Sequence, residues 1–265
     1  MPEALAPSDR SSRHGEWVAH QRDPHAPHNE IQLLGHFEIR TDGVAATLPS
    51  SAQRLLALLA LRGGRQHRST VAGTLWVDMS EGRAAANLRT AVWRARQVDR
   101  DLLDATGGYL AVRRQVRVDV VEVVGAAHLL SEGPPDRPVS PGAIDALGDE
   151  LLPEWYDDWV LLEREHLRQV RLHGLEVLCL RLTDERRFAT AIEAGLLAVA
   201  AEPLRESSHR ALMRAHVAEG NMGEAVRQFD SLARALWEHL RIEPSVVARA
   251  LVAPCRDRQV GWTAR

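Results

Sequence analysis

Apolar residues recur at every second position over residues 31–48, which is the pattern of half-buried β-strands. Asp42-Gly43 interrupts the alternation, and an Asp-Gly pair is typical of a two-residue hairpin turn. The alternating apolar positions are Ile31, Leu33, Phe37 and Ile39 before the turn and Val44, Ala46 and Leu48 after it. A small antiparallel sheet is therefore expected to open the fold.

Three helices are predicted next, because the apolar spacing changes to that of an α-helix. Ser50 and Gln53 have the spacing of a capping box and open the first helix, which a Gly-Gly pair ends. Ser69 or Thr70 caps the second helix. The third runs roughly over residues 83–98, and its buried face is predicted to be Leu88, Ala91, Val92 and Ala95.

Two extended runs follow the helices, over residues 109–112 and 116–120. Arg113, Arg114 and Gln115 lie between the runs and are predicted to form the tip of a hairpin. The order of sheet, three helices and hairpin is that of a winged helix-turn-helix domain of the response-regulator type. We place this domain at residues 30–118.

The rest of the chain is predicted to be helical. Residues 118–130 form a bridging helix, and residues 133–142, with four prolines and two glycines, form a loop before a long amphipathic helix that ends near Leu182. Phe188 and Met222 are 34 residues apart, as are two Ala-(Ile/Val) pairs, which favours tetratricopeptide-like packing over residues 119–253. A generic helical bundle is the alternative. Residues 254–265 are predicted to be a C-terminal tail, and the fold class is mainly α with a small antiparallel β part.

The first 29 residues are rich in proline, serine, histidine and charge, and we predict a disordered tail. Four histidines in this tail are the one candidate metal cluster: His14, His20, His25 and His28. Their spacing is irregular and no cysteine or acid pair accompanies them, so a plain tail is favoured over a metal site. We expect no metal or other cofactor.

Composition points to the cytoplasm. No run of about 18 apolar residues is present to span a membrane. Acids at Glu3 and Asp9, and the lack of an apolar core segment, do not fit a secretory signal. Cys179 and Cys255 are the two cysteines and neither lies in a Cys-x-x-Cys motif, which fits a reducing compartment.

Charge is unevenly distributed along the chain, whose 33 basic residues are all arginine. Residues 36–117 hold 13 arginines and 7 acids, a net charge of +6. Residues 118–265 hold 17 arginines and 24 acids, a net charge of −7. This division predicts that nucleic acid contacts the first part alone.

The third helix carries the chemistry for reading DNA. The major groove admits one α-helix, whose exposed side chains reach base edges. Asn87, Thr90 and Arg94 lie on one stripe, and their side chains can contact adenine, a thymine methyl group and guanine, respectively. Arg89 and Arg96 flank the stripe and suit phosphates. The alternative is an ordinary solvated helix face.

Two further predictions concern the same domain. Arg113 and Arg114 at a hairpin tip fit a wing that follows the backbone or enters the minor groove, although a charged exposed turn has the same pattern. Trp93 is expected to pack, either between the third helix and the sheet or against the neighbouring domain, and not to stack on a base.

Enzyme motifs are weak. Asp157-Asp158 beside Glu154 have the composition of a paired-carboxylate acid/base site, but acids at a helix start also favour the helix dipole. Gly63-Gly64-Arg65 lacks the spacing and the lysine of a phosphate-binding loop. We therefore do not expect an enzyme.

Several stretches resemble the Streptomyces antibiotic regulatory protein (SARP) family. IQLLGHFEI resembles its first strand, SAQRLLALLALRGGR and STVAGTLW its first two helices, and AAANLRTAVWRAR its recognition helix. LLPEWYDDWVLLEREHLRQVRLHGLEVL and AAEPLRESSHRALMRAHVAEGN are similar to its bacterial transcriptional activator domain, and RIEPS to the end of that domain. The resemblance covers about nine-tenths of the chain.

The resemblance implies a transcriptional activator that binds direct repeats near promoter −35 regions. It implies recruitment of RNA polymerase through the sigma and alpha subunits, control of a biosynthetic gene cluster such as one for an antibiotic, and a homodimer on DNA. The implied DNA-binding residues are those of the third helix and the wing: Arg83, Asn87, Arg89, Thr90, Arg94, Arg96, Arg113 and Arg114.

The chain departs from the family pattern in places. It is similar to the short form, without the nucleotide-binding extension of many relatives and without a receiver domain. Ala95 stands where a larger apolar residue is common. Arg83 places a cation at the positive end of a helix dipole, which a nearby phosphate would compensate. The alternative function is a tetratricopeptide-like interaction adaptor whose winged helix docks protein and not DNA.

Overall fold

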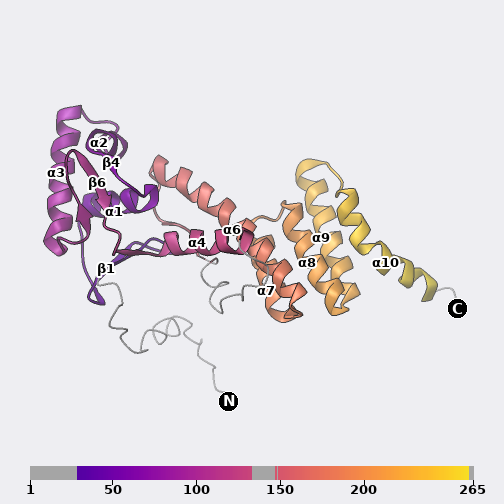
Figure 1. Ribbon diagram of the computed structural model, residues 1–265. Coiled ribbons are helices and arrows are strands. Elements are labelled where there is room, and N and C mark those ends of the chain that lie inside the picture. The colour runs from indigo at the N-terminus through magenta and orange to yellow at the C-terminus, as the bar shows by residue number, and fades with distance from the viewer. Residues whose placement is uncertain (1–28, 133–146, 148, 263–265) are drawn as a thin grey trace, which may run out of the picture.

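A computed structural model of the protein describes residues 29–132, 147 and 149–262, with side chains up to residue 254. The predicted N-terminal tail with its four histidines and the predicted loop over 133–142 therefore lie outside the described residues. The described chain is elongated, with a mixed α/β unit at one end and a row of helices extending away from it (Figure 1). The fold class is as predicted: mainly α, with a small β part near the N-terminus.

The N-terminal sheet forms from the alternating segment. Strands β1 (Asn29–Gln32), β2 (Glu38–Thr41) and β3 (Val44–Ala45) pair antiparallel, with Ile31 opposite Ile39 and both side chains buried. Asp42 and Gly43 both have positive φ angles, 53° and 78°, as a two-residue hairpin turn requires. The predicted turn is confirmed. Asn29 is buried in β1, so the predicted tail extends one residue too far.

Three helices follow: α1 (Ser50–Arg62), α2 (Arg68–Leu75) and α3 (Glu81–Val98). The first is buried over most of its length, and the Gly63-Gly64 pair ends it with φ angles of 60° and 57°, a conformation that glycine adopts without strain. The predicted buried face of α3 is confirmed, and α3 starts two residues before the predicted position.

Both predicted helix caps are wrong. Pro49 occupies the N-cap of α1, so Ser50 already lies inside the helix, and the amide of Gln53 donates to the carbonyl of Leu48 at 2.8 Å. At α2 the capping side chain is that of His67, whose ring accepts from the backbone N–H of Ser69. Helix α1 therefore begins at the predicted cap residue, and α2 begins one residue before Ser69.

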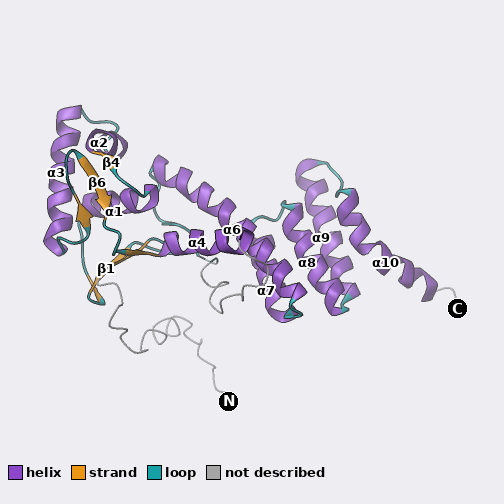
Figure 2. Cartoon of the chain, viewed as in Figure 1, coloured by secondary structure: helices purple, strands orange, loops and turns teal. Residues whose placement is uncertain are grey.

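The second sheet corrects the predicted hairpin. Its strands are β4 (Gln66–His67), β5 (Leu103–Asp104) and β6 (Tyr109–Val112), in the order β4-β6-β5 (Figure 2). The hairpin is β5–β6, and its turn holds Gly107 and Gly108 with φ angles of 60° and 81°. Strand β7 (Arg117–Val118) pairs in parallel with β1 of the other sheet and does not pair with β6.

The remaining helices are α4 (Asp119–Glu132), α6 (Asp158–Asp184), α7 (Phe188–Ala201), α8 (Glu206–Glu219), α9 (Met222–Leu240) and α10 (Val246–Trp262). Each packs on the next, and α6 also packs on α8 and α8 on α10, which is tetratricopeptide-like stacking. Helices α7 and α9 begin at Phe188 and Met222, the two positions of the predicted 34-residue period. The segment predicted as a C-terminal tail continues α10 as far as Trp262.

A rigid set of contacts joins the two parts. Leu34 forms an isolated antiparallel bridge with Leu151, and the carboxylate of Asp119 accepts from the backbone N–H groups of Leu33 and Leu34 at 2.9–3.0 Å. Helix α4 contacts both β1 and α6. One hydrophobic core therefore runs from the N-terminal sheet into the helical row.

No helix within the described ranges is long and apolar enough to cross a bilayer. Within the same ranges no group of three or more His, Cys, Asp or Glu side chains is placed to hold a metal ion.

Candidate nucleic-acid interface

The outward face of α3 is strongly basic. Ala84, Leu88, Ala91 and Ala95 are buried against the other helices, so the opposite face is turned to solvent. Arg83, Arg89 and Arg96 are exposed there, and none has a hydrogen-bond or ion-pair partner in the described part of the chain. A helix face with unpaired cations attracts an anionic partner.

Arginines of the helical part differ from these three, because most of those that the structure describes pair with an acid. Arg205 pairs with Glu176 at 2.7 Å, and Arg168 pairs with both Glu165 and Glu202. Further pairs are those of Arg164, Arg187, Arg210, Arg227 and Arg249. Free positive charge is therefore concentrated on the N-terminal domain.

Not every predicted base-reading residue is equally exposed. Thr90 and Arg94 are exposed, whereas Asn87 is half-buried and its amide nitrogen lies 3.1 Å from the sulfur of Met79. The hydroxyl of Thr90 donates to the carbonyl of Ala86. The structure thus brings Arg83, Thr90 and Arg94 onto one accessible stripe, with Asn87 at its edge.

The prediction that Trp93 packs in the core or against the neighbouring domain is wrong. Its side chain is 52% exposed on the outward face of α3, and the guanidinium of Arg94 lies 4.9 Å from the ring centroid. The interior positions of α3 are filled by small residues and leucine, which leaves no space there for an indole.

The predicted wing residues are also misplaced. Arg113 and Arg114 lie in the turn that leads from β6 to β7, at the opposite end of β6 from the hairpin turn. Arg113 pairs with Asp101 at 3.1 Å, and its backbone N–H donates to the carbonyl of Leu102. The Gly107-Gly108 pair forms the hairpin turn, so the hairpin lies before β6 and not after it.

The cation at the true wing tip is Arg65. Its guanidinium donates to the carbonyl of Thr106 in the turn at 3.1 Å and lies 5.3 Å from the ring centroid of Tyr109. His67 makes an edge contact with the same ring. The Gly-Gly turn and the Gly-Gly-Arg sequence after α1 were the signals for this contact, but only strand pairing brings the two segments together.

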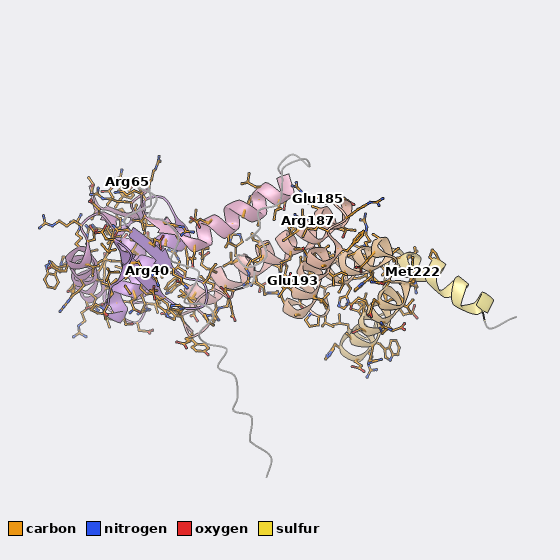
Figure 3. The ribbon with its side chains drawn as sticks, turned by 90° about the horizontal axis from the view of Figure 1, so that it is seen from below. Arg40, Arg65, Glu185, Arg187, Glu193 and Met222 are labelled. Atoms are coloured by element: carbon orange, nitrogen blue, oxygen red, sulfur yellow. The ribbon has the colours of Figure 1, made fainter. Side chains whose placement is uncertain are left out.

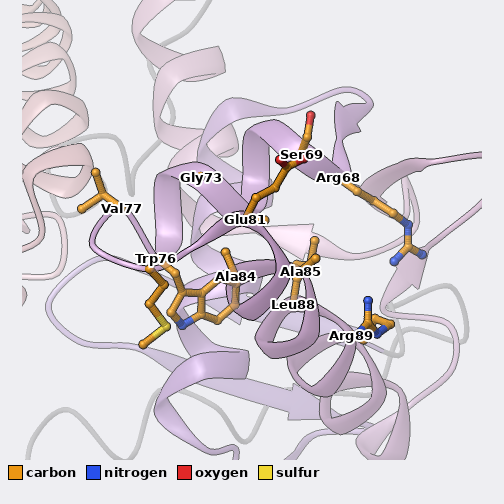
Figure 4. Close-up of a pocket in the computed structure, with 12 residues that line it drawn as sticks. Arg68, Ser69, Gly73, Trp76, Val77, Glu81, Ala84, Ala85, Leu88 and Arg89 are labelled. Carbon is orange, nitrogen blue, oxygen red and sulfur yellow. The ribbon is translucent and has the colours of Figure 1, made fainter.

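A groove of about 490 Å³ lies between α2 and α3. Arg68 and Arg89 lie at one end of this groove, and Trp76 and Val77 lie at the other (Figure 4). Two cations from different helices at one end provide a place for a phosphate group between them.

The two parts of the molecule differ in charge along its length. Arg40 and Arg65 lie on the N-terminal domain, well separated from Glu193 and from the paired Glu185 and Arg187 on the helical row (Figure 3). This arrangement matches the net charges of +6 and −7 for residues 36–117 and 118–265.

The acidic pair at the start of α6 is not arranged as an acid/base site. Asp157 is the N-cap residue of α6 and pairs with the guanidinium of Arg54 from α1. The same guanidinium donates to the carbonyl of Leu75 at 3.0 Å. Asp157 thus connects the two domains, and Asp158 lies at the favourable end of the helix dipole.

Fold and site together define a winged helix-turn-helix protein with an attached tetratricopeptide-like domain. The profile of the family described as "Bacterial transcriptional activator domain" matches residues 123–254. Regulatory protein AfsR of Streptomyces coelicolor is 28% identical over 87% of this chain. The chain spans 25% of the length of AfsR.

A solved structure has the same fold. Mycobacterium tuberculosis EmbR, in complex with a low-affinity phosphopeptide, aligns with a TM-score of 0.66 and 18% sequence identity over 85% of this chain and 64% of EmbR. Residues 123–254 therefore carry a bacterial transcriptional activator domain, and the chain is similar to regulatory protein AfsR over most of its length.

Proposed function

We propose that the protein is a sequence-specific DNA-binding transcriptional activator, with residues 30–118 as the DNA-binding domain and 119–253 as the activator domain. Helix α3 enters the major groove, with Arg83, Thr90 and Arg94 toward base edges and Arg89 and Arg96 toward phosphates. The observation that supports this best is the set of unpaired, exposed arginines on α3.

The wing of this proposal is the β5–β6 hairpin with Arg65 at its tip, in place of Arg113 and Arg114. The guanidinium of Arg65 contacts both the Thr106 carbonyl and the Tyr109 ring, so the hairpin fixes the position of its positive charge. Arg68 and Arg89 clamp a further phosphate at the end of the groove. Asn87 contributes to base reading once its contact with Met79 is exchanged for adenine.

The resemblance to the SARP family and the similarity to AfsR support the finer features of the proposal. We infer that the protein binds promoter direct repeats near the −35 region as a homodimer and recruits RNA polymerase through its sigma and alpha subunits. We infer further that it controls a secondary-metabolite gene cluster and acts in the cytoplasm at the nucleoid. The acidic surplus of the helical domain keeps this domain off DNA and leaves it for protein contacts.

The test is selection of binding sites from a random duplex library by the full-length protein, followed by affinity measurements over a series of salt concentrations. Three phosphate contacts, one by Arg65, one by the Arg68–Arg89 pair and one by Arg96, predict a log–log salt slope of about −3 per protomer. A library without enrichment, or a slope near zero, would instead favour the adaptor function, with a protein on the winged helix.

Dimerisation is tested on the selected site. A fragment over residues 30–120 is expected to bind a two-repeat site more weakly than the whole chain, because it lacks the helical domain that joins two protomers. Equal affinities of fragment and whole chain would contradict a homodimer formed through that domain.

A further inference from the structure

Trp93 occupies the middle of the outward face of α3. Thr90, Trp93 and Gln97 are exposed at positions i, i+3 and i+7, which places them on one stripe of the helix. This stripe lies opposite the buried stripe of Leu88, Ala91 and Ala95. An indole ring therefore lies in the middle of the face that α3 presents to a partner, with cations around it.

The surroundings of this ring restrict the partner that it fits. Arg89 and Arg96 are one helical turn away on either side, and Arg94 lies against the ring itself. No other aromatic ring of the described chain packs on Trp93. An apolar surface enclosed by cations fits an apolar group on an anionic partner. In the major groove of DNA that group is the C5 methyl of thymine.

Arg94 extends this inference to the next base pair. Its guanidinium carbon lies 4.9 Å from the centroid of the Trp93 ring, so the two side chains leave the helix as a stacked pair. Neighbouring bases on a strand are separated by about 3.4 Å along the helix axis. A stacked pair of this spacing reaches adjacent base pairs, and guanine offers the two acceptors that a guanidinium pairs with.

We propose that Trp93 is a specificity-determining residue that packs on the methyl group of a thymine, while Arg94 bonds to a guanine in the adjacent base pair. The proposal rests on the proposed function, since it requires α3 in the major groove. It adds an apolar contact, made by a residue outside the predicted set of DNA-binding residues.

The experiment uses the full-length protein and the site selected from the duplex library. Each thymine of that site is replaced in turn by deoxyuridine, which removes only the C5 methyl group. At one thymine, next to a guanine, this replacement is expected to lower the affinity of the wild-type protein about fourfold, which corresponds to the loss of one buried methyl group. In Trp93→Ala the thymine and deoxyuridine duplexes are expected to bind equally.

Trp237→Ala is the matched control. Trp237 is 54% exposed on α9 of the helical domain and has its own arginine, Arg241, 5.8 Å from the ring centroid. This variant is expected to keep the fourfold preference for thymine. Trp93→Phe retains an apolar ring at the same helix position and is expected to keep a preference for thymine over deoxyuridine. This variant controls for a folding defect in Trp93→Ala.

The outcomes separate the two proposals. Failure of the library to enrich any duplex contradicts DNA binding itself. Enrichment with a steep salt slope, but with no methyl-sensitive thymine, overturns the role of Trp93 and leaves the proposed function intact. A methyl preference that persists in Trp93→Ala, or a sensitive thymine without a neighbouring guanine, also overturns the inference.

Discussion

Asp119 holds the N-terminal winged helix-turn-helix domain to the helical domain, and its replacement tests how much this contact stabilises the protein. Both carboxylate oxygens accept hydrogen bonds: from the N–H of Leu33 at 2.9–3.0 Å, from that of Leu34 at 2.9 Å and from that of Val120 at 2.7 Å. Strand β1 ends at Gln32, so the first two N–H groups have no strand partner. Burial raises the pKa of Asp119, and the three N–H donors oppose this rise.

The size of the effect follows from these bonds. Leu33 is fully buried and Leu34 is 6% exposed, so Asp119→Ala leaves two buried donors without an acceptor. Each such donor costs about 1–3 kcal/mol, and because Asp119 itself is only partly buried, we expect a total loss of about 2–4 kcal/mol. Asp119→Asn keeps one acceptor oxygen and is expected to lose about half as much.

The assay is urea unfolding followed by circular dichroism, with hydrogen exchange at the amides of Leu33 and Leu34. Glu122→Gln is the matched control, because Glu122 lies in the same first turn of α4 and pairs with Arg117 at an exposed site. Exposed pairs contribute about 0–1 kcal/mol. If both Asp119 variants unfold within about 0.5 kcal/mol of the wild type and the two amides stay protected, the reasoning is refuted.

Three further predictions concern other sites. The pKa of Glu176 is held below 4.5, because hydrogen bonds from Arg205 and two serines outweigh the effect of burial. The ionised carboxylate therefore stabilises the fold above pH 4.5, and this stabilisation is lost as the pH falls through the folded-state pKa. In urea unfolding, the stability difference between the wild type and Glu176→Gln should be about 3 kcal/mol at neutral pH and should shrink in acid. Gly195→Ala should destabilise the protein by about 1–3 kcal/mol in thermal unfolding, since a Cβ there would lie 3.1 Å from the side chain of Leu212. An unchanged stability would show that α8 can shift away from the added methyl group. Arg65→Ala should reduce the salt slope of DNA binding by about one unit, and an unchanged slope would remove Arg65 from the wing contact.

Local chain properties were sufficient to predict most elements. The alternation around Ile31 and Ile39, the Asp42-Gly43 turn and the buried stripe of α3 were correct, because each depends on residues within a few positions of one another. The 34-residue offset between Phe188 and Met222 predicted the helical stacking for the same reason, since each repeat packs on its sequence neighbours.

Long-range pairing required the tertiary structure. Whether the strand at 117–118 joins β6 or β1 depends on contacts across more than 80 residues, and its pairing with β1 moved Arg113 and Arg114 away from the wing. Arg65 reached the wing by the same kind of contact.

The sequence by itself determined the order of the elements, the fold class, the division of charge and the helix that carries the exposed arginines. It did so because propensity, periodicity and composition are local properties of a chain. The exposure of Trp93, the partner of Asp157 and the position of the wing were decided only by packing, since a side chain's burial depends on which distant segments arrive beside it.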